Sequence, residues 1–84
     1  MINALVMTPR IKISVKGMSF NPCFFATSAE AVRLLQKLNA SPFKDTWKNV
    51  GDGLEEFIAK PDHGKLIEVN FNIYSQLMEW HMIA

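Results

Sequence analysis

The sequence has a single cysteine, Cys23, and no long hydrophobic run. One cysteine cannot form an intrachain disulfide, which excludes the stapled frameworks of small secreted proteins and indicates a reducing compartment. The early apolar run from Ala4 to Met7 is too short for the hydrophobic core of a signal peptide, and nothing reaches the length of a membrane span. We therefore expect a soluble, cytoplasmic protein without a membrane partner.

Sequence motifs for common chemistry are also missing. Gly51-Asp52-Gly53 lacks the longer glycine spacing and the following lysine of a phosphate-binding loop. Neither His63 nor His81 has a cysteine or histidine partner at the spacing of a structural zinc site. Cys23 lies in an apolar run, where an inert thiol is expected. The sequence thus predicts a protein that is not an enzyme, with no catalytic, cofactor-binding or metal-binding residues.

What the sequence does have is a large apolar content in a short chain. Its 84 residues are 49% hydrophobic and include six phenylalanines, two tryptophans and one tyrosine. This length predicts one domain over residues 1–84, with residues 1–9 as a frayed end or an edge strand. A domain of this size buries only roughly 60–65% of its unfolded surface. We expect a partner, in the first place a second copy in a homodimer, to cover the remaining aromatic side chains.

The first half of the chain predicts a hairpin followed by a helix. Residues 10–16 alternate apolar and basic or polar side chains, as does a half-buried strand with a basic outer face. Gly17 and Asn21-Pro22 are turn signals, so residues 23–26 are expected to pair back as a second strand. Thr27 and Glu30 then have the spacing of a capping box. An apolar stripe at helical spacing follows and predicts a helix that ends near residues 39–41. The stripe consists of Ala31, Leu34, Leu35 and Leu38.

The second half predicts two short helices, a strand and an undecided tail. We expect a helix over residues 43–49, a break at Val50-Gly51 and a second helix over residues 53–60. Residues 65–73 alternate as a strand does, whereas residues 74–84 fit either a strand or a helix. The expected fold class is α+β: a small three- to four-stranded, mostly antiparallel sheet with two or three helices packed on one face.

The tail is the first candidate for a functional surface. Aromatic residues and methionine are enriched in protein interfaces, and Tyr74, Met78, Trp80 and Met82 collect here. These four residues are the predicted protein interface. The sequence is then that of a small protein-binding domain, an accessory or inhibitory protein that docks on a larger protein assembly.

The alternative is a small regulator that binds nucleic acid. Residues 1–44 hold six basic residues and one acidic residue, whereas residues 45–84 hold three basic and seven acidic residues. Arg10, Lys12 and Lys16 share one face of the first predicted strand, and such a face with aromatic side chains can track a single strand by charge and stacking. Against this alternative, the aromatic residues Phe20, Phe24 and Phe25 are expected to pack in the core, and the net charge is only +1.

Overall fold

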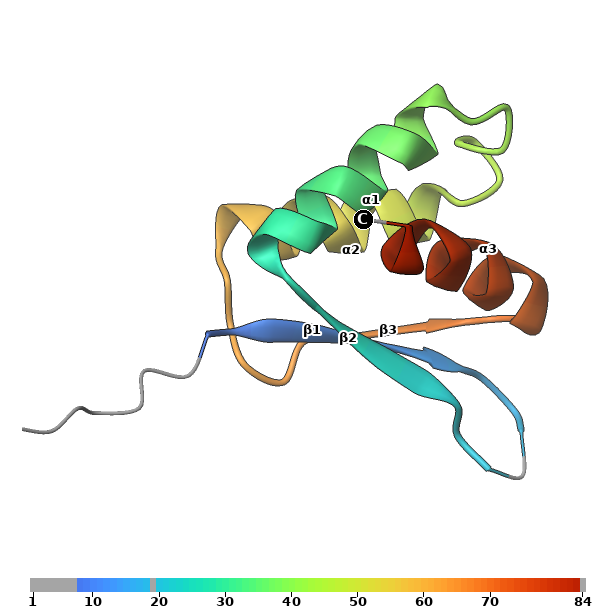
Figure 1. The fold of residues 1–84 in the computed structure, drawn as a ribbon, viewed down its shortest axis with the longest axis horizontal. Coiled ribbons are helices and arrows are strands. Elements are labelled where there is room, and N and C mark those ends of the chain that lie inside the picture. The colour runs from blue at the N-terminus through green and yellow to red at the C-terminus, as the bar shows by residue number, and fades with distance from the viewer. Residues whose placement is uncertain (1–7, 19, 84) are drawn as a thin grey trace, which may run out of the picture.

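The computed structural model describes residues 8–18 and 20–83, which form a three-stranded sheet covered on one face by three helices (Figure 1). Met1 to Met7 lie outside the described residues, and with them most of the predicted N-terminal edge strand; Thr8 and Pro9 belong to no helix or strand. In chain order the elements are β1 (Arg10–Val15), β2 (Cys23–Thr27), α1 (Ser28–Ala40), α2 (Lys48–Ala59), β3 (Leu66–Val69) and α3 (Phe71–Met82).

The sheet is mixed, which confirms the α+β class and corrects its predicted strand directions. The strand order is β2-β1-β3, with β1 antiparallel to β2 and parallel to β3. The prediction of a mostly antiparallel sheet was wrong because α1 and α2 lie between β2 and β3. After these two helices the chain re-enters the sheet on the far side of β1 and runs in the direction of β1.

The hairpin of β1 and β2 agrees with the sequence pattern. Ile13 lies opposite Phe24 and Ile11 opposite Ala26, and all four side chains are buried beneath the helices. Gly17 adopts φ +80 in the connection, a conformation that favours glycine. The inner face of the sheet is thus continuous and apolar, and its remaining members are Val15, Ile67 and Val69.

Helix α1 begins with the predicted capping box. The backbone N–H of Glu30 donates to Oγ1 of Thr27 at 3.3 Å, and the backbone N–H of Thr27 donates to Oε1 of Glu30 at 2.8 Å. Two otherwise unpaired amides of the first helical turn are satisfied in this way. Farther along α1, Leu34 and Leu38 are buried in the core.

Helix α2 is continuous through both glycines, so the predicted helix over residues 43–49 and the break at Val50-Gly51 were wrong. Residues 42–47 form turns, and α2 runs from Lys48 to Ala59. A Cβ atom on Gly53 would lie 2.9 Å from Cδ1 of Ile67, so glycine lets the helix approach the sheet closely. The burial of Val50, Leu54 and Phe57 offsets the low helix propensity of the two glycines.

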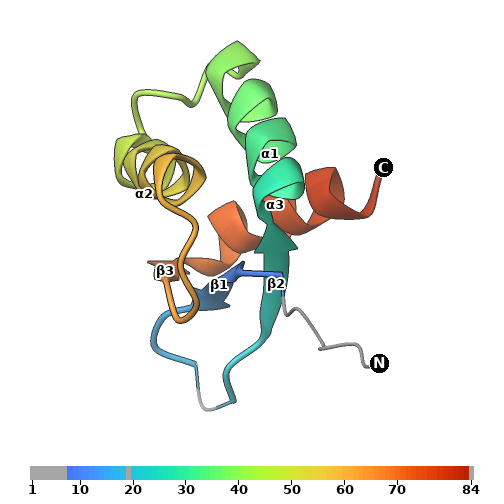
Figure 2. The same cartoon turned by 90° about the vertical axis from the view of Figure 1, so that its left-hand side faces the viewer.

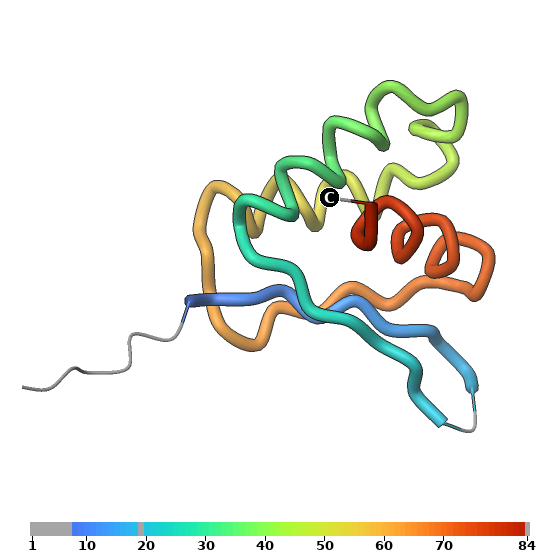
Figure 3. Tube along the Cα trace, in the orientation of Figure 1, coloured from blue at the N-terminus to red at the C-terminus, as the bar shows by residue number. Residues whose placement is uncertain are grey.

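The strand predicted for residues 65–73 ends at Val69, and the tail is a helix. Oδ1 of Asn70 accepts a hydrogen bond from the N–H of Ile73 at 2.9 Å, which caps α3 at its first turn. The Cα trace in Figure 3 shows the chain turning from β3 into α3, back across the covered face of the sheet. Helix α3 buries Tyr74 and Leu77. No helix among the described residues is long and apolar enough to cross a membrane.

Candidate functional site

Within the described residues no helix covers the outer face of the sheet, since α1, α2 and α3 all lie on the other face (Figure 2); we call this outer face the open face. Strand alternation places the even-numbered residues of β1 on this face. Lys12 occupies the middle of it, with Phe25 of β2 as its neighbour on one side and Leu66 of β3 on the other. In the next row, Ser14 lies between Cys23 and Glu68. The face therefore combines a basic central strand with apolar side chains on both flanking strands.

The charge on this face is mainly positive. Arg10 and Lys16 are exposed and Lys12 is half-buried, whereas Glu68 is the acidic residue that β3 contributes. Within residues 8–18 and 20–83, no carboxylate lies within 4.0 Å of the charged nitrogens of Arg10, Lys12 or Lys16. Of the three residues that the sequence proposed for nucleic-acid contact, Arg10 and Lys12 thus lie on β1 and Lys16 lies in the turn directly after it.

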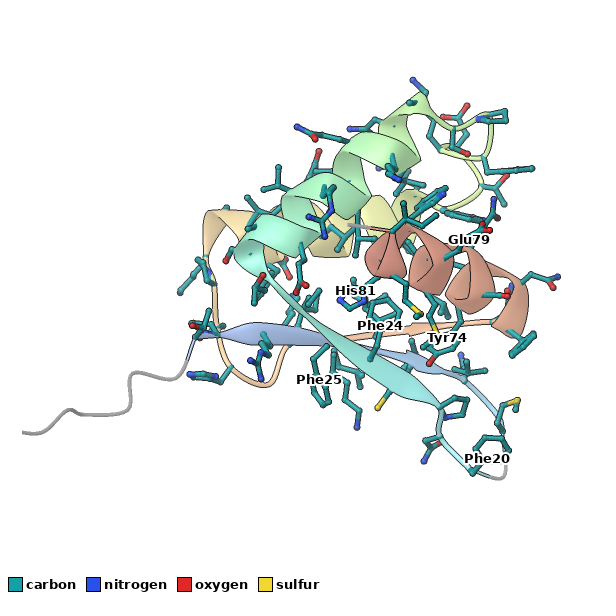
Figure 4. All side chains as sticks on the ribbon, in the orientation of Figure 1. Phe20, Phe24, Phe25, Tyr74, Glu79 and His81 are labelled. Atoms are coloured by element: carbon teal, nitrogen blue, oxygen red, sulfur yellow. The ribbon has the colours of Figure 1, made fainter. Side chains whose placement is uncertain are left out.

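Phe24 and Phe25 point to opposite faces of β2 (Figure 4). Phe24 is buried and lies 5.6 Å from the ring of Tyr74, whereas Phe25 is 50% exposed on the open face. Of the three rings expected in the core, Phe20, Phe24 and Phe25, only Phe24 is buried there. Strand alternation in residues 23–27 is the sequence signal that separates the two rings. Phe20, in the hairpin connection, is a second ring exposed to solvent, at 65%.

A cavity of about 230 Å³ lies at one end of the open face. Its lining residues come from the chain at the start of β1, from β2 and from the turn before β3: Thr8, Arg10, Phe25, His63 and Gly64. No carboxylate lines it. A second cavity of about 200 Å³ between α1 and α2 differs in charge, since Asp45, Asp52 and Glu55 line it beside two lysines. The cavity on the sheet is thus the one suited to an anion.

The four residues predicted as a protein interface do not form one exposed surface. Tyr74 is 5% exposed, and burial raises the pKa of its phenol. Trp80 is half-buried with its ring 5.6 Å from that of Trp47, and Met78 packs partly buried against the core. Met82 alone is open to solvent, at 72%. Three of the four side chains thus contribute to the internal packing of α3.

His81 joins the end of α3 to the start of α1. Its Nε2 lies 3.4 Å from Oε2 of Glu30, without hydrogen-bond geometry, and its ring lies 4.6 Å from that of Phe24. The hydrogen bond from the backbone N–H of Thr27 lowers the pKa of Glu30, and the charge of His81 lowers it further. Partial burial of the Glu30 carboxylate acts in the opposite direction. Because this partly buried cluster joins two helices of the fold, we assign it to stability.

The remaining candidate groups form no recognisable reaction centre. Cys23 is half-buried on the open face opposite Ser14. His63 lies in the turn before β3, and His81 contacts Glu30 on the helical side. Across the part of the chain that the structure describes, no group of three His, Cys, Asp or Glu side chains could hold a metal ion.

No known protein family matches this chain, and neither a curated protein nor a solved structure shows significant similarity to it.

Proposed function

We propose that this protein is a small non-enzymatic binding domain that binds single-stranded nucleic acid on the open face of its sheet. The observation that carries the proposal is the position of Lys12 between the exposed side chains of Phe25 and Leu66, with Arg10 on the same strand and Lys16 in the turn that follows it. Cations contact phosphates, and an exposed ring offers a platform for a base. This combination is the chemistry of single-strand recognition without a requirement for sequence.

The dimensions of the face suit a short run of nucleotides. At a rise of roughly 3.3 Å per residue, the distance from Arg10 to Lys16 is about 20 Å. The uncovered face of a sheet lets the bases of a single strand lie against its side chains. A base-paired duplex cannot bind in this way because its bases are stacked inside. We therefore expect preference for single strands over duplexes.

Three phosphate contacts predict moderate affinity with a defined dependence on salt. For single strands, log K falls against log salt with a slope of about −0.7 per phosphate contact, so three contacts give about −2. Affinity should then fall roughly 20-fold between about 50 and about 200 mM salt. The net charge of +1 is compatible with this, because no described carboxylate forms an ion pair with Arg10 or Lys12 of β1 or with Lys16 in the turn after it.

The test is a fluorescence anisotropy titration of a labelled single-stranded oligonucleotide at several salt concentrations. Lys12→Ala should weaken binding and reduce the slope by about 0.7. Lys44→Ala is the matched control, because Lys44 is an exposed lysine in the connection between α1 and α2, away from the sheet. Absence of binding at low salt, or an equal effect of the two substitutions, would remove the proposal.

Docking on a larger protein is the second candidate, and exposed apolar side chains on α3 favour it. Phe71, Met82 and Ile83 are 56%, 72% and 60% exposed. Such side chains support an accessory or inhibitory protein, or a homodimer that covers them against a second copy. Sedimentation of wild type and Met82→Ser tests the homodimer: a monomer at every concentration would end it. A cytoplasmic location remains a prediction.

A further inference from the structure

We infer that the cavity lined by Thr8, Arg10, Phe25, His63 and Gly64 is a subsite for one nucleotide, whose base stacks on Phe25 while Arg10 and His63 hold its phosphate. This inference rests on the proposed function and adds to it a place on the open face where a single unit of the strand is gripped. The inference also gives a role to His63, which lies in the turn before β3 and does not belong to the basic residues of β1.

Three segments far apart in the sequence form this cavity. Arg10 begins β1, Phe25 is the third residue of β2, and His63-Gly64 is the turn that precedes β3. Figure 1 shows the loop before β3 passing beside the start of β1. At about 230 Å³ the cavity is smaller than the sites of roughly 300–1,000 Å³ that enclose drug-sized ligands. A site of this size holds at most one nucleotide unit.

The lining supplies the two interactions that a nucleotide needs. Phe25 presents a half-exposed ring, and base–aromatic stacking accepts any base because each has a π-face. Arg10 carries a planar guanidinium that can hold a phosphate through two N–H groups, and His63 adds a further N–H donor.

Two further features favour an anionic ligand here. None of the side chains around the cavity is a carboxylate, whereas Asp45, Asp52 and Glu55 line the cavity between α1 and α2 and would repel a phosphate. Gly64 adopts φ +85 and has open space around it, so at this residue only backbone lines the cavity and no side chain obstructs a ligand.

The experiment titrates the ¹⁵N-labelled protein separately with adenosine monophosphate, adenosine and inorganic phosphate, followed by amide chemical shifts. Adenosine monophosphate should saturably shift the amides of Arg10, Phe25 and Gly64. Adenosine and phosphate should each bind at least about tenfold more weakly than the monophosphate, because each keeps only one of the two interactions. His63→Ala should lower the affinity for the monophosphate about tenfold, and His63→Gln, which keeps a donor, by less.

Lys16→Ala separates the subsite from the rest of the face. Lys16 lies on the open face but outside the cavity, so this variant should bind adenosine monophosphate as wild type does and the oligonucleotide more weakly. Oligonucleotide binding without localised shifts from the monophosphate would overturn the subsite and leave the proposed function standing. If neither the oligonucleotide nor the monophosphate binds, both the subsite and the proposed function are overturned. Equal binding of phosphate and monophosphate would overturn the role of Phe25.

Discussion

Replacing Phe25 with alanine should abolish most of the affinity for single strands while leaving the fold intact. Phe25 is half exposed and points away from the helices, so its removal opens no cavity in the core. Strand propensities span only about 1 kcal/mol, so Phe25→Ala should lower the free energy of unfolding by no more than this amount. Stacking of one base on an aromatic ring contributes about 1–3 kcal/mol, so the dissociation constant should rise about 5- to 150-fold.

Phe24→Ala is the matched control, because Phe24 is the neighbouring phenylalanine on the opposite face of β2. Its ring is 7% exposed and packs against Tyr74 and His81, so alanine should cost about 3–5 kcal/mol of stability. Anisotropy titration and chemical denaturation of both variants check the pair. Phe25→Trp should retain binding. Unchanged affinity of a folded Phe25→Ala protein would refute stacking on the open face.

The remaining predictions concern the framework that holds this face. Gly51→Ala should raise the free energy of unfolding by about 0.5–1 kcal/mol, because the new Cβ would meet Leu38 at an ordinary 3.4 Å. Gly53→Ala should raise it less or lower it, because its Cβ would come too close to the side chain of Ile67. Denaturant titration of both variants compares them. The folded-state pKa of Glu30 is lowered, so its contribution to stability is present above its usual value of 4.5 and is lost as pH falls through the folded pKa. Glu30→Gln, which keeps the cap, should show a shallower loss of stability over that acidic range; the same slope as wild type would contradict this.

Local signals in the sequence were sufficient for β1, β2 and α1. Alternation defined β1, and the Thr27–Glu30 spacing defined the start of α1, because both patterns are decided by neighbouring residues. The end of β3 was missed because Phe71 and Ile73 continue the alternation of the strand into the first turn of α3. Asn70, a preferred N-cap residue, was the signal that could have shown the boundary.

Contacts distant in sequence decided the rest. The parallel pairing of β3 with β1 and the continuity of α2 depend on how the helices pack on the sheet, which no local pattern records. For the candidate site, Arg10, Lys12 and Lys16 were identified from the sequence, whereas Phe25 was assigned to the core and His63 was considered as a metal ligand and given no role. Their convergence with Arg10 on one cavity follows from the sheet order and the turn before β3.

The central claim is that the open face of the sheet binds a single strand, and amide chemical-shift mapping with a short single-stranded oligonucleotide at low salt tests it most directly. We predict that the largest shifts occur at Arg10, Lys12, Phe25 and Leu66, with little change along α3. Shifts confined to the exposed end of α3, at Met82 and Ile83, or no shifts at all, would contradict the account.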